Sequence, residues 1–209
     1  PVDIHSIKTL KFAQNIQNKE IKAIFDKLTN EQKIIVRLAA FLHDIGKGRT
    51  QDHHIVGEKL LKSMLKSFYF NDETIRIAAE LVRYHNMMSY VANHEDIYSE
   101  KAILNFTGLI ETKESLDMLY IITYCDISAV GENIFNSSTA SLLKQLYTQS
   151  IPAFENQELL TESKRRIAKQ NAIKNLERYK ELPLSIKKKI MSIASNQIFL
   201  RLKAEDILD

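Results

Sequence analysis

The scarcity of glycine and proline constrains this chain more than any other feature of its sequence. Only five glycines and three prolines occur among 209 residues, against roughly 12% for the two together in an average protein. Sandwiches and barrels need turns at short intervals, and turns depend on these two residues. The sequence therefore predicts a mainly helical protein. Its 44% apolar and 26% charged residues are typical of a folded globular domain.

The remaining composition argues against several classes of protein. A single cysteine, Cys125, excludes a disulfide framework and supplies too few thiolates for a zinc finger or an iron–sulfur cluster. The net charge is only +3, and the basic clusters 164–166 and 187–189 lack interleaved aromatic residues, which disfavours nucleic-acid binding. No apolar run approaches the roughly 20 residues that cross a bilayer, and the N-terminus lacks the order of a signal peptide. We therefore expect a cytoplasmic protein without a membrane partner, and the start at Pro1 suggests a part of something longer.

Capping residues and apolar periodicity divide the chain into successive helices. Thr29 begins a capping box, and Asp52 and Asn71 can each cap a helix. Residues 87–95 show no clear period and are interpreted as a loop, in which His94 is a surface histidine or a satisfied core histidine rather than a ligand. The expected helices cover residues 30–45, 53–68, 72–86, 99–107, 113–130, 137–149, 161–181 and 184–195.

One of these segments, 113–130, is apolar around most of its circumference and ends at Gly131, as a central buried helix would. Asp126 interrupts this apolar surface. A lone buried carboxylate is costly, so a cation or hydrogen-bond donors must accompany it. By position alone, an arginine, a lysine or the hydroxyls of Thr123 or Tyr124 would serve as well as a metal ion.

A second polar feature is His43-Asp44, which precedes the turn IGKGR (45–49). Adjacent imidazole and carboxylate groups can bind one divalent ion, and the glycines permit a sharp turn. Lys47 and Arg49 then point toward an anion. Five of the six histidines fall at expected helix ends or in adjacent loops, where side chains from different helices can converge.

The order of these polar residues carries a resemblance to a known family. The series His5, His43-Asp44, His53, His85 and Asp126 resembles the HD-domain superfamily of metal-dependent phosphohydrolases. Longer stretches resemble the HD domain of the bifunctional uridylyltransferase/uridylyl-removing enzymes that modify the PII nitrogen-regulatory protein, nearly from end to end. These stretches are FLHDIGKGRTQDHHIVGE (41–58), ELVRYHNMMSYVA (80–92), DMLYIITYCDISAVGENIFNSS (117–138) and NQIFLRLKAEDIL (196–208).

The resemblance implies a fold and a role for each matching residue. The fold is an all-α HD-domain helical bundle over residues 1–150, with additional C-terminal helices over 151–209 packed on or beside it. The cofactor is a divalent metal ion, Mg²⁺ or Mn²⁺, while Fe²⁺ and Co²⁺ also suit a mixed nitrogen and oxygen ligand set. The implied metal ligands are His5, His43, Asp44 and Asp126, and the implied catalytic residues are Lys47, Arg49, His53 and His85.

His53 and His85 match positions that bind a second metal or contact the phosphate in HD enzymes. The spacing to Gly57 selects His53 over its neighbour His54, which leaves His54 as a bystander. At Tyr84 the family commonly has a further histidine, so the resemblance does not imply a complete second metal site.

The implied activity is hydrolysis of a phosphodiester that releases UMP from a uridylylated tyrosine of a PII-type protein. None of the five glycines precedes a serine, as a nucleotidyltransferase signature requires, and no βαββαβ regulatory repeat is visible. The chain is therefore expected to be the hydrolase portion alone. Two alternatives stay open: another HD phosphohydrolase acting on nucleotides or cyclic nucleotides, and a non-catalytic regulatory or interaction module derived from an HD domain.

Overall fold

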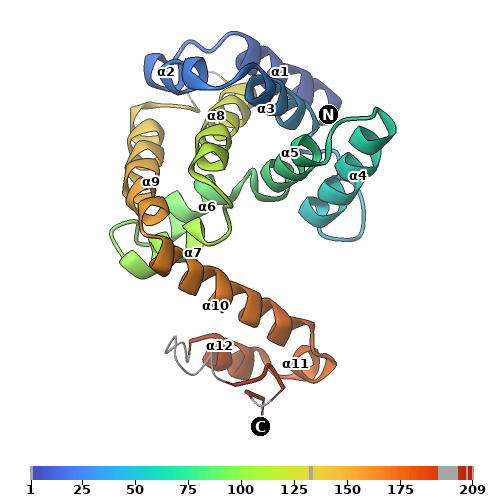
Figure 1. Ribbon diagram of the computed structural model, residues 1–209, viewed down its shortest axis with the longest axis vertical. Helices are drawn as coiled ribbons and strands as arrows, with labels where there is room; N and C mark the ends of the chain where they lie inside the picture. The colour runs from blue at the N-terminus through green and yellow to red at the C-terminus, as the bar shows by residue number, and fades with distance from the viewer. Residues whose placement is uncertain (1, 132–133, 193–201, 206, 209) are drawn as a thin grey trace.

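The computed structural model describes residues 2–131, 134–192, 202–205 and 207–208. These residues form twelve α-helices and no strand (Figure 1), which confirms the prediction of an all-α fold. The helices are α1 (Val2–Gln14), α2 (Lys19–Lys27), α3 (Asn30–Leu42), α4 (His53–Ser67), α5 (Asp72–Tyr84), α6 (Met87–His94), α7 (Glu100–Thr107), α8 (Lys113–Val130), α9 (Ser137–Glu155), α10 (Gln157–Asn175), α11 (Glu177–Glu181) and α12 (Leu184–Ser192).

Helix α8 is the central element of the main bundle. Every residue from Ser115 to Cys125 is buried, as the apolar sequence predicts. The helix packs against α1, α2, α3, α5, α6 and α9, and it stands in the middle of the main bundle in Figure 1. Asp126, near the C-terminal end of α8, lies beside His5 of α1 and His43 at the end of α3.

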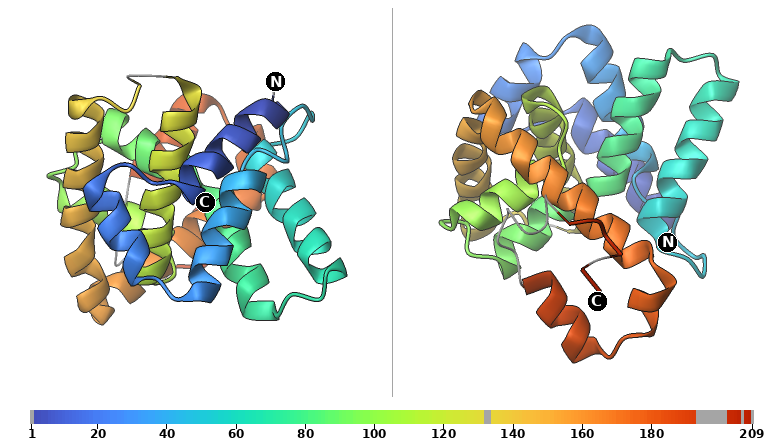
Figure 2. Two further views of the ribbon diagram at one scale, coloured as in Figure 1. Left: turned by 90° about the horizontal axis from the view of Figure 1, so that it is seen from above. Right: turned by 60° about the horizontal axis from the view of Figure 1, so that its bottom comes forward.

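Beyond the main bundle, α10 leads to a smaller lobe that contains α11 and α12 (Figures 1 and 2). This lobe has its own apolar cluster, which includes Ile173, Tyr179 and Ala204. Helix α10 packs against α7, α9 and α11, so the lobe is tied to the bundle along one helix. The division into an HD part over 1–150 and an extension over 151–209 remains a prediction.

The expected loop over residues 87–95 is wrong, because most of this segment forms helix α6. Met88, Val91 and Ala92 are buried at the i, i+3 and i+4 spacing of one helix face. Neighbouring polar residues obscured this short pattern in the sequence. His94 ends the helix and is exposed, which agrees with its interpretation as a surface histidine.

Helix α9 continues six residues beyond its expected end at 149, through Pro152. Proline interrupts the hydrogen bonds of a helix, but the turn that contains it packs well. Ala153 is buried and Phe154 contacts the main core, so burial of this turn offsets the lost bond.

The charged segment expected as one helix over 161–181 is two helices, α10 and α11. The backbone at Leu176 is extended, with φ −68° and ψ 132°, and its side chain packs on the small C-terminal cluster. Residues 193–195 of the last expected helix, and most of the 196–208 stretch, lie outside the described residues.

Candidate metal centre

Two helices of the bundle end on histidines in the same geometry. His43 is the C-cap of α3 and His85 is the C-cap of α5. Nδ1 of His43 lies 2.9 Å from the carbonyl oxygen of Ala40, and Nδ1 of His85 lies 2.8 Å from that of Val82. Because a carbonyl oxygen only accepts, each Nδ1 carries a proton. In the neutral ring each Nε2 then keeps its lone pair for the site.

The turn after α3 presses against the start of α4. A Cβ atom on Gly46 would lie 2.0 Å from the carbonyl oxygen of His53 and 2.6 Å from the backbone nitrogen of Gly57. Only glycine fits there, and the close approach brings His43 and Asp44 next to the helix that begins with His53. Gly48 alone provides the left-handed turn, with φ +82°. The two glycines predicted to permit one sharp turn thus have different roles.

The four side chains predicted as metal ligands meet between α1, α3 and α8. Nε2 of His5 lies 2.7 Å from Oδ1 of Asp126, and Nε2 of His43 lies 3.5 Å from the same oxygen. Nε2 of His43 is also 3.3 Å from Oδ2 of Asp44. Each of His5, His43 and Asp44 offers one ligand atom, and these atoms lie within 4.8 Å of one another. Residues 121 positions apart in the sequence therefore face one small space.

Buried atoms without partners indicate that this space suits a cation. His43 is 1% exposed and Asp44 is 2% exposed. Within the described part of the chain, Nε2 of His43 and Oδ1 of Asp44 have no hydrogen-bond partner. A buried polar atom left unpaired costs about 1–3 kcal/mol. Converging imidazole and carboxylate lone pairs are a ligand set for a divalent ion, so the cluster can hold a metal.

The electrostatics of the cluster show which proton a metal would displace. Burial opposes a charged imidazole at His43, but the neighbouring carboxylates of Asp126 and Asp44 raise its pKa to about 9. Burial also acts to raise the pKa of Asp44, yet His43 and Lys47 hold it well below its usual range. Against the same effect of burial, His43 and His5 lower the pKa of Asp126. Without a metal, a proton on His43 balances the two carboxylates, so metal and proton compete for this site.

Asp126 is less buried than its sequence context predicts. Its side chain is 25% exposed, because it lies in the last turns of α8, at the edge of the core. Neither arginine nor lysine pairs with it among the described residues, and the hydroxyl of Thr123 donates to the carbonyl oxygen of Leu119 instead. Its partners are the imidazoles of His5 and His43.

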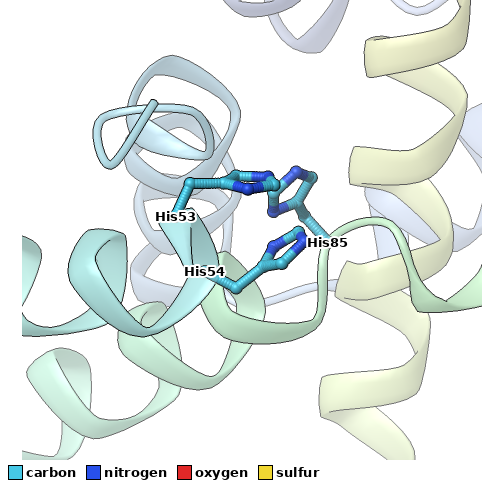
Figure 3. A group of neighbouring side chains, drawn as sticks. All are labelled: His53, His54 and His85. Carbon is cyan, nitrogen blue, oxygen red and sulfur yellow. The ribbon is translucent and has the colours of Figure 1, made fainter. Parts of the chain in front are cut away.

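A second group of histidines lies beside this cluster (Figure 3). His53 and His54 begin α4 and face His85, and each offers a ligand atom within 4.8 Å of the others. Nε2 of His85 lies 3.6 Å from Oδ1 of Asp44, so Asp44 stands between the two groups. Burial lowers the pKa of His85 to about 4, which leaves its ring neutral at pH 7.

His54, which the sequence left as a bystander, lies within this second group of histidines. Its ring centroid lies 4.9 Å from that of His85 and 3.8 Å from that of His53. The side-chain oxygen of Asp52 accepts from the backbone nitrogen of His54, as the predicted cap requires, and this orients the first turn of α4. The spacing to Gly57 selects His53 in the sequence, but the first turn of α4 places the rings of both His53 and His54 beside His85.

The two predicted basic residues are placed differently. Nζ of Lys47 lies 2.6 Å from Oδ2 of Asp44, which puts its charge at the cluster. Arg49 is exposed and forms no ion pair or hydrogen bond with the cluster in the part of the chain that the structure describes. Tyr84, where the family commonly has a histidine, packs against the main core.

The helical bundle and the His, His-Asp, Asp arrangement define the class of protein. The chain belongs to the HD domain family, which matches residues 2–121, a stretch that contains every predicted site residue except Asp126. Among curated relatives, the bifunctional uridylyltransferase/uridylyl-removing enzyme of Cereibacter sphaeroides is 31% identical over 159 residues, which cover 74% of this chain and 17% of that protein.

Proteins of the same name from Bradyrhizobium diazoefficiens and Ruegeria pomeroyi are 32% and 31% identical, over 72% and 74% of this chain. The chain thus spans less than a fifth of these relatives, with 17% and 18% of their lengths covered. The aligned share is also smaller than the nearly end-to-end resemblance suggested by the sequence. No helix among the described residues is long and apolar enough to cross a membrane.

Proposed function

We propose that this chain is a metal-dependent phosphodiesterase that removes uridylyl groups from a PII-type regulatory protein. The HD domain family and the names of its relatives support this reaction. The observation that carries the proposal is the pair of buried, unpaired atoms, Nε2 of His43 and Oδ1 of Asp44, within the described residues. They lie beside the polar contacts of Asp126 and His5.

In this proposal the metal ligands are His5, His43, Asp44 and Asp126. The ion is Mg²⁺ or Mn²⁺, and Fe²⁺ or Co²⁺ would also match these donors. A divalent cation supplies Lewis-acid activation of water and offsets charge on the phosphate. The ligand side chains fix its position, because His43 and Asp44 follow the end of α3 while His5 and Asp126 belong to α1 and α8.

The other residues of the site act on the substrate. His85 keeps a neutral ring whose Nδ1 proton is committed to Val82, so its Nε2 accepts a hydrogen bond from water. Lys47 stabilises charge on the non-bridging phosphate oxygens, and Arg49 adds a second positive charge when substrate is bound. His53, in the second histidine group beside the metal cluster, passes a proton to the leaving phenolate.

The bonds and protons of the reaction balance. Water forms a new bond to phosphorus, and the bond from phosphorus to the tyrosine oxygen breaks. One proton of the water passes to the solvent. The leaving phenolate takes a proton from His53, and His53 regains a proton from the solvent. The products are UMP and an unmodified tyrosine.

The test is release of UMP from uridylylated PII protein by the purified chain with Mn²⁺. His43→Ala and Asp126→Asn should each lower release by more than about 100-fold, since even outer-shell partners of metal ligands contribute 10- to 100-fold. Both variants should also lose bound metal in elemental analysis. His94→Ala, at an exposed histidine away from the cluster, is the control and should keep both.

Other outcomes would redirect the proposal. Absence of release, beside an active full-length enzyme as control, would contradict it. Turnover of free nucleotides or cyclic nucleotides without PII would favour another HD phosphohydrolase. Tight PII binding with neither metal nor hydrolysis would favour a non-catalytic interaction module.

A further inference from the structure

A cavity of about 500 Å³ adjoins the proposed metal centre. The first two turns of α1 form one wall, and the end of α3 with the turn that follows forms the other. Asp44 and Lys47 line this cavity as well as contacting each other in the polar cluster. One ligand can therefore place a phosphate at the cluster and a second group in the adjoining cavity.

Most of the cavity wall is apolar. Phe41 and Ile7 line it while remaining 42% and 48% exposed. Phe41 precedes Asp44 by three residues, so about one helical turn separates the ring from the carboxylate. An aromatic face beside a phosphate site is a stacking platform for a flat ring, and stacking on an aromatic side chain contributes about 1–3 kcal/mol per base.

Two polar side chains complete the wall on α1. Asp3 and Ser6 line the cavity, and their i, i+3 spacing puts them on one face of the helix. Ser6 is only 6% exposed and brings a hydroxyl that can donate. An ionised Asp3 can only accept, and its negative charge opposes any second phosphate in the cavity. The complementary ligand is neutral and flat, with a ring N–H next to a carbonyl.

We propose that this cavity binds the nucleobase of the nucleotidyl group and selects an oxopyrimidine. This inference rests on the proposed function and names the part of the substrate that the chain recognises. The base stacks on Phe41, its ring N–H donates to Asp3, and Ser6 donates to the adjacent carbonyl. Cytosine has an unprotonated ring nitrogen at the equivalent position, so two acceptors would face each other there. A phenol ring has neither group, so the tyrosine of the partner lies outside this cavity.

The first experiment compares binding of UMP and CMP by calorimetry in the presence of Mn²⁺. UMP should bind about tenfold more tightly, which is the effect of one hydrogen bond to a charged group. Asp3→Asn should remove this preference. Asp26→Asn removes the same charge from an exposed position on α2 and should preserve it. Equal binding of UMP and CMP by the unaltered chain would overturn the inference.

The second experiment uses p-nitrophenyl esters of UMP and CMP, which share one leaving group, together with bis(p-nitrophenyl) phosphate, which has no base. Asp3→Asn should lower kcat/KM for the UMP ester about tenfold and change turnover of bis(p-nitrophenyl) phosphate by less than about twofold. An equal loss on both substrates would overturn base recognition and would point to the phenol ring as the occupant. Unfolding midpoints of the variants check that the fold is retained.

The two proposals fail separately. Preference for UMP without release of UMP from PII would support the cavity assignment and contradict the proposed function. Release of UMP from PII with equal affinity for UMP and CMP would do the reverse.

Discussion

His43 and His85 each use one ring nitrogen to cap a helix and present the other to the site. Each Nδ1 hydrogen bonds to a carbonyl three residues earlier, which satisfies a group that a helix end otherwise leaves free. The surroundings of the two rings shift their pKa values in opposite directions. Carboxylates outweigh burial and raise the pKa of His43 to about 9, whereas burial dominates at His85 and lowers its pKa to about 4. One local geometry thus yields a candidate ligand and a neutral acceptor.

The role of Lys47 can be tested with a single substitution. Its ammonium contacts Asp44, and in the proposed reaction it stabilises charge on the phosphate oxygens. Lys47→Ala should lower kcat about 10- to 100-fold through lost charge stabilisation. It should spare the metal, because removing a positive neighbour leaves Asp44 a better ligand. Turnover assays and elemental analysis measure the two effects.

The control for this variant is Lys62→Ala. Lys62 also forms an ion pair, with Glu58 on α4, but it does not line the cluster. Its removal should leave both turnover and metal content unchanged. Loss of metal from Lys47→Ala would show that this lysine organises the ligands rather than the phosphate.

At the scale of elements, the approach of the α3 turn to α4 depends on Gly46. A methyl group there would meet the carbonyl oxygen of His53 at 2.0 Å, so Gly46→Ala must separate the turn from the helix. Overpacking of this kind costs about 1–3 kcal/mol, and we expect urea unfolding to show a loss of that size. Metal affinity should fall with it, since the displaced turn moves Asp44 relative to the other proposed ligands, His5 and Asp126.

Gly48→Ala offers a matched comparison two residues later. A Cβ atom on Gly48 would meet nothing within 4 Å, but its φ is +82°. The expected cost is about 1 kcal/mol of backbone strain, with metal affinity unchanged. Equal effects of the two substitutions on metal affinity would contradict the role assigned to Gly46.

Glu80 joins α5 to the start of α8 and makes stability depend on pH. It accepts hydrogen bonds from the backbone nitrogen of Glu111 at 2.8 Å and from Oγ of Ser115 at 3.3 Å. Burial raises the pKa of Glu80 to about 7, and the Ser115 hydroxyl with the charges of Arg76 and Lys164 counters it only in part. The folded state therefore holds a proton that the unfolded chain has released above its ordinary pKa.

The sign of the effect follows from this raised pKa. The stabilisation is complete below pH about 4.5 and is lost as pH rises through about 7. Relative to Glu80→Gln, which cannot ionise, the unaltered chain should lose roughly 2 kcal/mol of unfolding free energy between pH 5 and pH 8. Urea unfolding of both proteins at the two pH values measures it. A constant difference would contradict the raised pKa.

The sequence reveals local features of these elements more readily than their long-range contacts. The capping box at Thr29 and the caps at Asp52 and Asn71 are present as predicted, because each depends on residues within a few positions. The apolar surface of α8 likewise identifies the central helix. Helix α6 was missed because its apolar face is only three residues long, and its stability comes from the core that it contacts.

The candidate site likewise depends on long-range contacts that the sequence does not reveal. The series of histidines and aspartates predicted which side chains would converge, through resemblance to a family. The backbone approach of Gly46 to His53 and the inclusion of His54 depend on how α3 meets α4, which no local pattern records. The exposure of Asp126 depends on the point at which α8 leaves the core. Its apolar sequence neighbours do not show this point, so they predicted more burial than the structure has.

At the scale of the whole molecule, the candidate centre links distant parts of the chain. His5 on α1 and Asp126 on α8 are separated by 121 positions and lie 2.7 Å apart. A metal that binds only where these helices meet binds the folded state and not the unfolded one, so it stabilises the fold by mass action. At a free concentration 100 times its dissociation constant the gain is about 2.7 kcal/mol.

For a domain of this size, each kcal/mol raises Tm by about 2–4 °C, so saturating Mn²⁺ should raise Tm of the chelator-treated chain by roughly 5–10 °C. His43→Ala should remove this rise, because it deletes a ligand that is 1% exposed at the centre of the cluster. His53→Ala should keep most of it, since His53 belongs to the second histidine group. Calorimetric scans with and without Mn²⁺ measure all three proteins. A rise of equal size in His43→Ala would mean that the stabilising ion binds elsewhere, and the four-ligand centre would then be wrong even if the chain were an active phosphodiesterase.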